Sequence, residues 1–145
     1  MYQRIAVGFD GSDPSRRALQ AAVMLGQCGG AELVVILIQE HVPRYPEMPS
    51  EVTEEREAID RYFVTLKREA ETLGRDAGLS VTAHVGAGNA PKLLCDIAKR
   101  EKADLLVIGV SGRSGGLWGN LLGSTADKVV DHAPCSVLVV RGTTA

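Results

Sequence analysis

Short apolar runs alternate along this chain with longer stretches in which apolar residues recur at every third or fourth position. The short runs, rich in β-branched residues, are typical of buried strands, and the longer stretches are typical of amphipathic helices. A more strictly alternating segment indicates a strand nearer the edge of a sheet. The pattern predicts strands at 4–9, 33–38, 80–85, 104–108 and 136–141, and helices at 14–29, 51–77, 91–98 and 126–133.

The predicted order is a strict alternation of strand and helix, which is typical of an α/β domain with a parallel sheet and helices on both faces. Apolar stripes give each helix its buried side, with Ala18, Ala22 and Leu25 in the first and Leu66 and Leu73 in the second. Three prolines make 41–50 a surface loop rather than a helix or an inner strand. In an open sheet of this kind, a ligand binds beyond the carboxyl ends of the strands, where the strand order reverses.

Length, charge and cysteine content limit the kind of protein that this chain can be. The chain has 145 residues, which predicts one domain over 1–145, and its net charge of −2 argues against a nucleic-acid surface. Apolar runs are too short to cross a bilayer, so no membrane association is expected. The absence of a leader pattern and the scattered cysteines Cys28, Cys95 and Cys135 lead us to expect a reduced, cytoplasmic protein.

A glycine-rich stretch joins the fourth predicted strand to the last helix. It contains Gly109 and Gly112 near its start, and Gly123, Ser124 and Thr125 at the start of the helix. Glycine backbone and a helix N-terminus can present bare N–H groups to a phosphate, so this stretch favours nucleotide binding. The alternatives are a turn that needs positive φ angles for the glycines, and a simple N-capping role for the two hydroxyl residues.

A second polar signal follows the first strand, at Asp10, Ser12 and Asp13. We assign Ser12 and Asp13 to helix capping. Asp10 is either a turn residue or a binding residue that accepts hydrogen bonds from the hydroxyl or amino groups of a nucleoside. Arg113 is the only cation in the glycine-rich stretch, and it either pairs with a phosphate or is solvated. The chain lacks a P-loop lysine motif, so at most slow ATP hydrolysis is expected, and no catalytic residue or protein metal ligand is assigned.

These segments together resemble the universal stress protein family over essentially the whole chain, and specifically its ATP-binding branch. The resemblance rests on the Asp-Gly-Ser run at 10–12, the Gly109 and Gly112 pair, the Gly-Ser-Thr run at 123–125, and the segment 132–141. In this chain the interval between Gly112 and Gly123 is one residue longer than in the family motif. The extra residue either loops out at a glycine or widens the phosphate-binding loop.

The resemblance implies an open five-stranded parallel sheet of order 3-2-1-4-5, the adenine nucleotide alpha hydrolase-like fold. It also implies ATP in the crevice between the first and fourth strands, with ADP, AMP and cyclic AMP as alternatives and with Mg²⁺ or Mn²⁺ carried on the phosphates. Asp10 and the backbone near Ile38 would contact the nucleoside. The ribose and phosphates would be held by Gly109, Gly112, Gly123, Ser124 and Thr125.

Three functions remain open on the sequence. The first is nucleotide binding with a regulatory or signalling role in stress response, acting on an unknown protein partner. The second is a dimeric interaction module of the same fold that binds no nucleotide, which the longer loop favours. The third is an adenylating enzyme, which the lack of a second domain disfavours. The apolar last strand, Ser136 to Val140, predicts a homodimer in which this edge is covered by the same strand of another copy.

Overall fold

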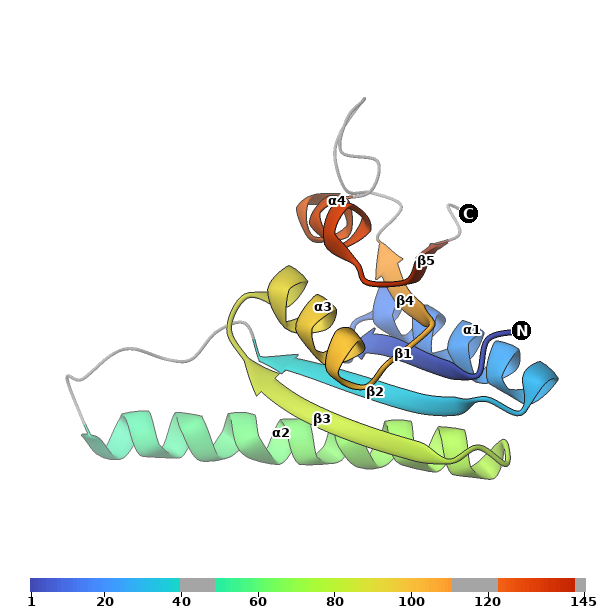
Figure 1. Ribbon diagram of the computed structural model, residues 1–145. Coiled ribbons are helices and arrows are strands. Elements are labelled where there is room, and N and C mark those ends of the chain that lie inside the picture. Colours follow the sequence, from blue (N-terminus) through green and yellow to red (C-terminus); the bar gives the residue numbers. More distant parts are fainter. Residues whose placement is uncertain (40–48, 111–122, 143–145) are drawn as a thin grey trace.

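A computed structural model describes residues 1–39, 49–110 and 123–142 of the chain (Figure 1). Strands and helices alternate throughout, as predicted. The strands are β1 (Arg4–Phe9), β2 (Glu32–Gln39), β3 (Val81–Ala87), β4 (Leu105–Val110) and β5 (Ser136–Arg141). The helices are α1 (Asp13–Gly29), α2 (Pro49–Asp76), α3 (Ala90–Arg100) and α4 (Gly123–His132).

The strands form one parallel sheet of order β3-β2-β1-β4-β5, which confirms the expected order (Figure 1). The side chains of Leu33 to Ile38 are all buried, because β2 lies inside the sheet and is covered on both faces. One core cluster joins the sheet to α1 and α2, and a second joins the opposite face to α3 and α4. The carboxyl ends of β1 and β4 therefore adjoin at the point where the order reverses.

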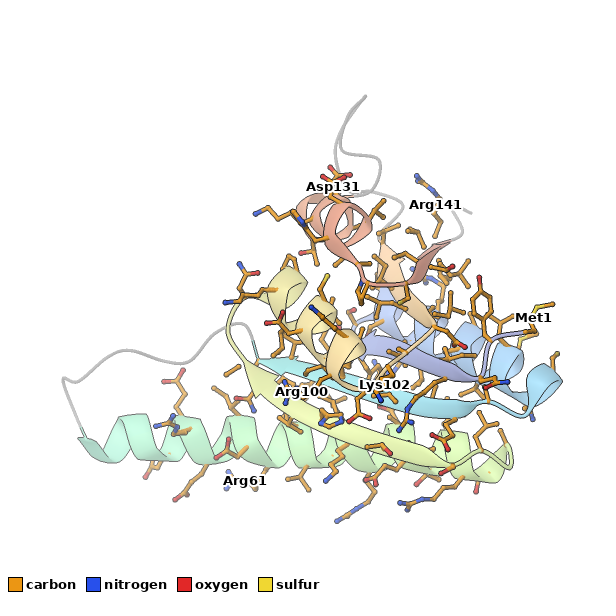
Figure 2. All side chains as sticks on the ribbon, viewed as in Figure 1. Met1, Arg61, Arg100, Lys102, Asp131 and Arg141 are labelled. Carbon is orange, nitrogen blue, oxygen red and sulfur yellow. The ribbon has the colours of Figure 1, made fainter. Side chains whose placement is uncertain are left out.

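Charged side chains lie on the outer surfaces of these layers. Figure 2 shows Arg61 on α2, Asp131 on α4 and Arg141 on β5 pointing away from the sheet. Two residues of the predicted apolar stripes also face outward, since Leu25 and Leu73 are each 39% exposed. Within the described residues, no helix is long and apolar enough to span a membrane.

Three predicted boundaries are wrong in informative ways. Strand β3 continues through Gly86 and Ala87, two residues past its predicted end, and these residues pair with the end of β2. Helix α2 begins at Pro49, inside the expected loop, because proline is accepted in a first helical turn. Strand β4 continues through Gly109, so this glycine belongs to the sheet and not to the loop that follows.

Candidate functional site

A cleft of about 270 Å³ lies at the carboxyl end of the sheet, where β1, β2 and β4 end beside α3 and α4. Four of the residues predicted to bind a nucleotide meet there, namely Asp10, Ile38, Gly109 and Thr125. The remaining lining residues are Gly8, Phe9, Ser12, Ser15, Ala90, Leu94 and Ile108. Residues 100 positions apart in sequence thus share one concave surface, as the strand order requires.

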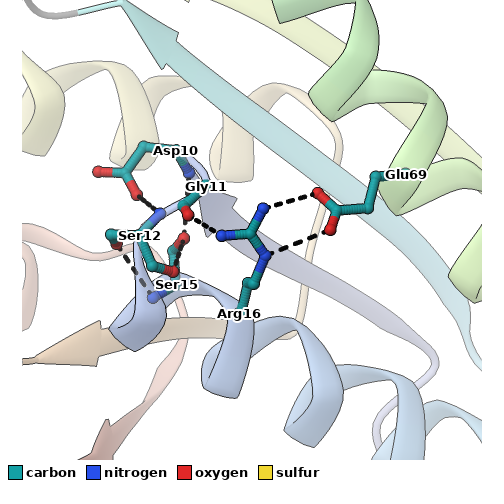
Figure 3. Close-up of polar contacts among 6 residues, drawn as sticks. All are labelled: Asp10, Gly11, Ser12, Ser15, Arg16 and Glu69. Carbon is teal, nitrogen blue, oxygen red and sulfur yellow. Dashed lines mark hydrogen bonds and ion pairs between the residues drawn. The ribbon is translucent and has the colours of Figure 1, made fainter. Parts of the chain in front are cut away.

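The turn between β1 and α1 holds Asp10 at the edge of this cleft (Figure 3). The Ser12 N–H donates to Asp10 Oδ1 at 2.9 Å, and the Asp10 N–H donates to Ser15 Oγ at 3.3 Å. Ser12 also caps α1 as predicted, because its hydroxyl oxygen accepts from the Ser15 N–H at 3.3 Å. The turn is therefore a closed network of short-range hydrogen bonds that fixes the backbone around Asp10.

The surroundings of the Asp10 carboxylate favour its ionised form. Partial burial opposes ionisation, but hydrogen bonds from Ser12 and Ser15 outweigh it and hold the pKa of Asp10 below its ordinary value. Among the described residues, Asp10 Oδ2 accepts no hydrogen bond. A charged acceptor of this kind suits hydroxyl or amino donors and repels phosphate.

Gly109 is required by packing against α1. A Cβ at this position would overlap the carbonyl group of Pro14 and would lie 3.1 Å from the backbone nitrogen of Ser15. Gly109 is absent from the glycines with positive φ, so the turn alternative is wrong for this residue. The glycine lets the first turn of α1 lie directly against β4, and this contact brings the Asp10 turn and β4 together as two sides of the cleft.

Apolar side chains form the floor of the cleft. Ile38 at the end of β2 and Ile108 on β4 face Ala90 and Leu94 of α3 across it. Such a surface suits a flat apolar ring whose polar edge is met by backbone groups. Thr125 stands in the first turn of α4, a helix of 10 residues whose N-terminus opens toward the cleft and favours an anion there.

The structure describes only some of the other residues predicted to bind a nucleotide. Helix α4 begins at Gly123, three residues earlier than predicted, so Ser124 and Thr125 lie inside its first turn and the N-capping alternative is wrong for both. Gly112 and Arg113 lie outside the described residues, together with the extra residue of the loop. The structure thus brings Asp10, Ile38 and Gly109 together with the first turn of α4, which follows the loop.

Sequence reasoning missed the α3 wall of the cleft. A Cβ at Gly8 would lie 2.9 Å from Leu94 Cδ2, so the glycine lets the end of the Leu94 side chain lie directly against β1. The available signal was a glycine one position before the end of an apolar strand, which often marks a close approach by another element. Ala90, beside the N-cap Asn89, completes this wall with a small side chain.

A larger hollow of about 530 Å³ lies between α1 and α2, on the opposite face of the sheet. Its lining includes Arg16, Leu19, Glu69 and Leu73 but none of the residues predicted to bind a nucleotide. Within the described ranges, no group of three or more His, Cys, Asp or Glu residues could hold a metal ion. The cleft at the ends of β1 and β4 is thus the hollow where residues predicted to bind a nucleotide come together.

Comparisons with known proteins agree with this architecture. The model of the universal stress protein family matches residues 1–141. A universal stress protein of Thermus aquaticus is 34% identical over 142 residues, which cover 97% of this chain and 100% of that protein. The crystal structure of a universal stress protein in complex with cAMP superposes with a TM-score of 0.70 at 26% identity, over 96% of each chain.

A further structure, that of hypothetical protein MJ0577, has a TM-score of 0.82 at 19% identity and covers 100% of this chain and 99% of its own, which shows a shared fold. These structural neighbours have the adenine nucleotide alpha hydrolase-like fold. The family model spans nearly the whole chain, and the expected strand order is present. This chain belongs to the universal stress protein family.

Proposed function

We propose that the cleft at the ends of β1 and β4 binds an adenine nucleotide, with ATP as the principal ligand, and that its occupancy has a regulatory or signalling role. The observation that supports the proposal is the convergence of Asp10, Ile38, Gly109 and Thr125 on one cleft. The similar protein crystallised with cAMP supports the adenine nucleotide class.

The cleft fits the nucleoside part of such a ligand. Small-molecule sites have volumes of about 300–1,000 Å³, and this one is near the lower limit at about 270 Å³. A base would lie against Ile38, Leu94 and Ile108, and ribose hydroxyls would donate to Asp10 Oδ2. The phosphates would extend toward the N-terminus of α4 at Thr125, with any Mg²⁺ or Mn²⁺ carried on them.

Calorimetric titration of ATP, ADP, AMP and cyclic AMP into wild type and Asp10→Asn tests this proposal. Asn keeps an acceptor for the Ser12 N–H but loses the charge, so the Kd should rise about tenfold. Asp104→Asn is the matched control, because Asp104 also accepts backbone N–H groups but does so at the opposite, amino end of the sheet. Mass spectrometry of nucleotide extracted from freshly purified protein identifies the ligand bound in the cell.

Failure of all four nucleotides to bind wild type at millimolar concentration would instead support the alternative, an interaction module that binds no nucleotide. Equal weakening by Asp10→Asn and Asp104→Asn would place the site elsewhere. Hydrogen exchange with and without ATP addresses the regulatory role, since a regulatory ligand must change protection outside the cleft.

We also propose that the protein forms a homodimer through β5. This strand is at the edge of the sheet, and its four central residues are only half-buried within one chain. An apolar edge needs a cover, and a second β5 related by a two-fold axis supplies one. Sedimentation equilibrium should give twice the chain mass of 15.4 kDa. A single-chain mass at every concentration would contradict the dimer.

A further inference from the structure

The turn that presents Asp10 is covered from behind by helix α2. Gly11, at the centre of this turn, has a φ of +85°, and a Cβ there would lie 2.6 Å from Tyr62 Oη and 2.9 Å from Leu66 Cδ2. Both neighbours belong to α2, which lies on the face of the sheet opposite α3 (Figure 1). The turn thus has one side toward the cleft and one side in contact with α2.

The Arg16 side chain contacts both the turn and helix α2 (Figure 3). Its Nη1 donates to the carbonyl oxygen of Gly11. Its Nε and Nη2 donate to Glu69 Oε1 and Oε2 of α2, each at 3.2 Å, in a two-pronged ion pair. The guanidinium also lies 5.9 Å from the centre of the Phe9 ring. These contacts place the guanidinium between the Gly11 carbonyl, the Glu69 carboxylate and the Phe9 ring.

The contact at Gly11 reaches Asp10 through one peptide group. The Gly11 carbonyl that accepts from Arg16 and the Ser12 N–H that donates to Asp10 Oδ1 are the two ends of the same planar amide. Holding the oxygen of this amide therefore sets the direction of its N–H. A cation on the oxygen also polarises the amide and strengthens the N–H as a donor.

We infer that Arg16 is a positioning residue for the nucleoside end of the cleft, which orients the Asp10 carboxylate through the Gly11–Ser12 peptide and is itself oriented by Glu69 of α2. The inference rests on the proposed function, because it assigns Asp10 to nucleoside recognition. It adds that a residue outside the cleft lining, on the far side of the turn, sets the affinity for the nucleoside.

The test compares Arg16→Ala with a control, Arg75→Ala. The control removes the 3.1 Å ion pair between Arg75 and Glu71, both of which lie on α2 far from the turn. Arg16→Ala should raise the Kd for both adenosine and ATP about tenfold, by the same factor, because Asp10 contacts the part that they share. Arg75→Ala should leave both values unchanged. Both variants should unfold at nearly the wild-type urea concentration, because exposed ion pairs contribute little to stability.

A double-mutant cycle separates positioning from a general structural role. In an Asp10→Ala background there is no carboxylate to orient, so Arg16→Ala should change the Kd less than about twofold. Arg16→Lys keeps a donor for the Gly11 carbonyl and should restore part of the affinity. In the protein without ligand, Arg16→Ala should move the Ser12 amide proton signal upfield, which reports the peptide directly.

Each outcome has a distinct meaning. If wild type binds adenosine and Arg16→Ala binds it equally well, the inference is overturned and the proposed function stands. If the losses from Asp10→Ala and Arg16→Ala are additive, Arg16 does not act through Asp10 and the inference also fails. If wild type binds no adenine nucleotide, the proposed function fails, and the Ser12 amide signal alone decides whether Arg16 fixes the peptide.

Discussion

Replacing Gly109 with alanine tests whether this glycine serves packing. The added Cβ would overlap the Pro14 carbonyl group, which is backbone and cannot rotate away like a side chain. Overpacking of this kind destabilises by about 1–3 kcal/mol. Replacing a glycine in a strand also stabilises the folded state by up to about 1 kcal/mol, because glycine loses the most conformational freedom on folding. Because the overlap is with backbone, we expect a cost at the upper end of this range, about 3 kcal/mol, and therefore a net loss of about 2 kcal/mol.

Thermal unfolding followed by circular dichroism measures this loss. In a domain of this size, about 2 kcal/mol lowers Tm by roughly 4–8 °C. Gly29→Ala is the matched control, since its Cβ would lie 3.5 Å from the Tyr2 carbonyl oxygen, an ordinary contact at the end of α1. This control should be neutral or stabilised by up to about 1 kcal/mol.

An unchanged or higher Tm for Gly109→Ala would refute the reasoning, because it would mean that α1 and β4 separate freely at this contact. The packing role also changes how a bulky Gly109 variant is interpreted. Gly109→Val would disturb the fold and the cleft together, so a loss of nucleotide binding in that variant would not identify a phosphate contact. Asp10→Asn is the better probe of the site.

Three further predictions concern stability. Ser12→Ala removes the N-cap of α1 and should lower the free energy of unfolding by about 1 kcal/mol in urea titrations. Leu106→Ala leaves a cavity at a fully buried position of β4 and should cost about 2–5 kcal/mol by the same measurement. Desolvation opposes ionisation of Asp104, but N–H donors from Gln3 and Arg4 leave its pKa below the ordinary value. Its stabilisation is therefore complete above about pH 4 and lost as the pH falls through the lowered pKa, and Asp104→Asn should flatten this acid limb of the stability curve.

The order of elements was predictable because its signals are local. An apolar run such as 33–38 and an N-cap such as Ser12 can be recognised from a few neighbouring residues. The structure confirms the strand and the cap. The strand order came from the family resemblance, since periodicity carries no information on which strands are neighbours. With that order, the meeting of Asp10 and Gly109 followed, and the cleft contains both.

The parts that could not be predicted depend on contacts between distant segments. Nothing near Arg16 in the sequence indicates Glu69, which is 53 residues away on another helix. The end of β4 was misplaced because a glycine was interpreted as the start of a loop, whereas Gly109 is a strand residue facing the first turn of α1. Glycine has no side chain to reveal which of these roles it has, and only the neighbouring backbone distinguishes them.

The closed hydrogen-bond network at Asp10 has a thermodynamic consequence for ligand selection. The turn is held by its own hydrogen bonds, so a nucleoside bound at the proposed site would lose little free energy to ordering the protein. This advantage is identical for adenosine, AMP, ADP and ATP, because all four present the same base and ribose. If the proposed site is correct, this half of the cleft would set a common baseline affinity, and any preference for the number of phosphates would have to arise at the other end.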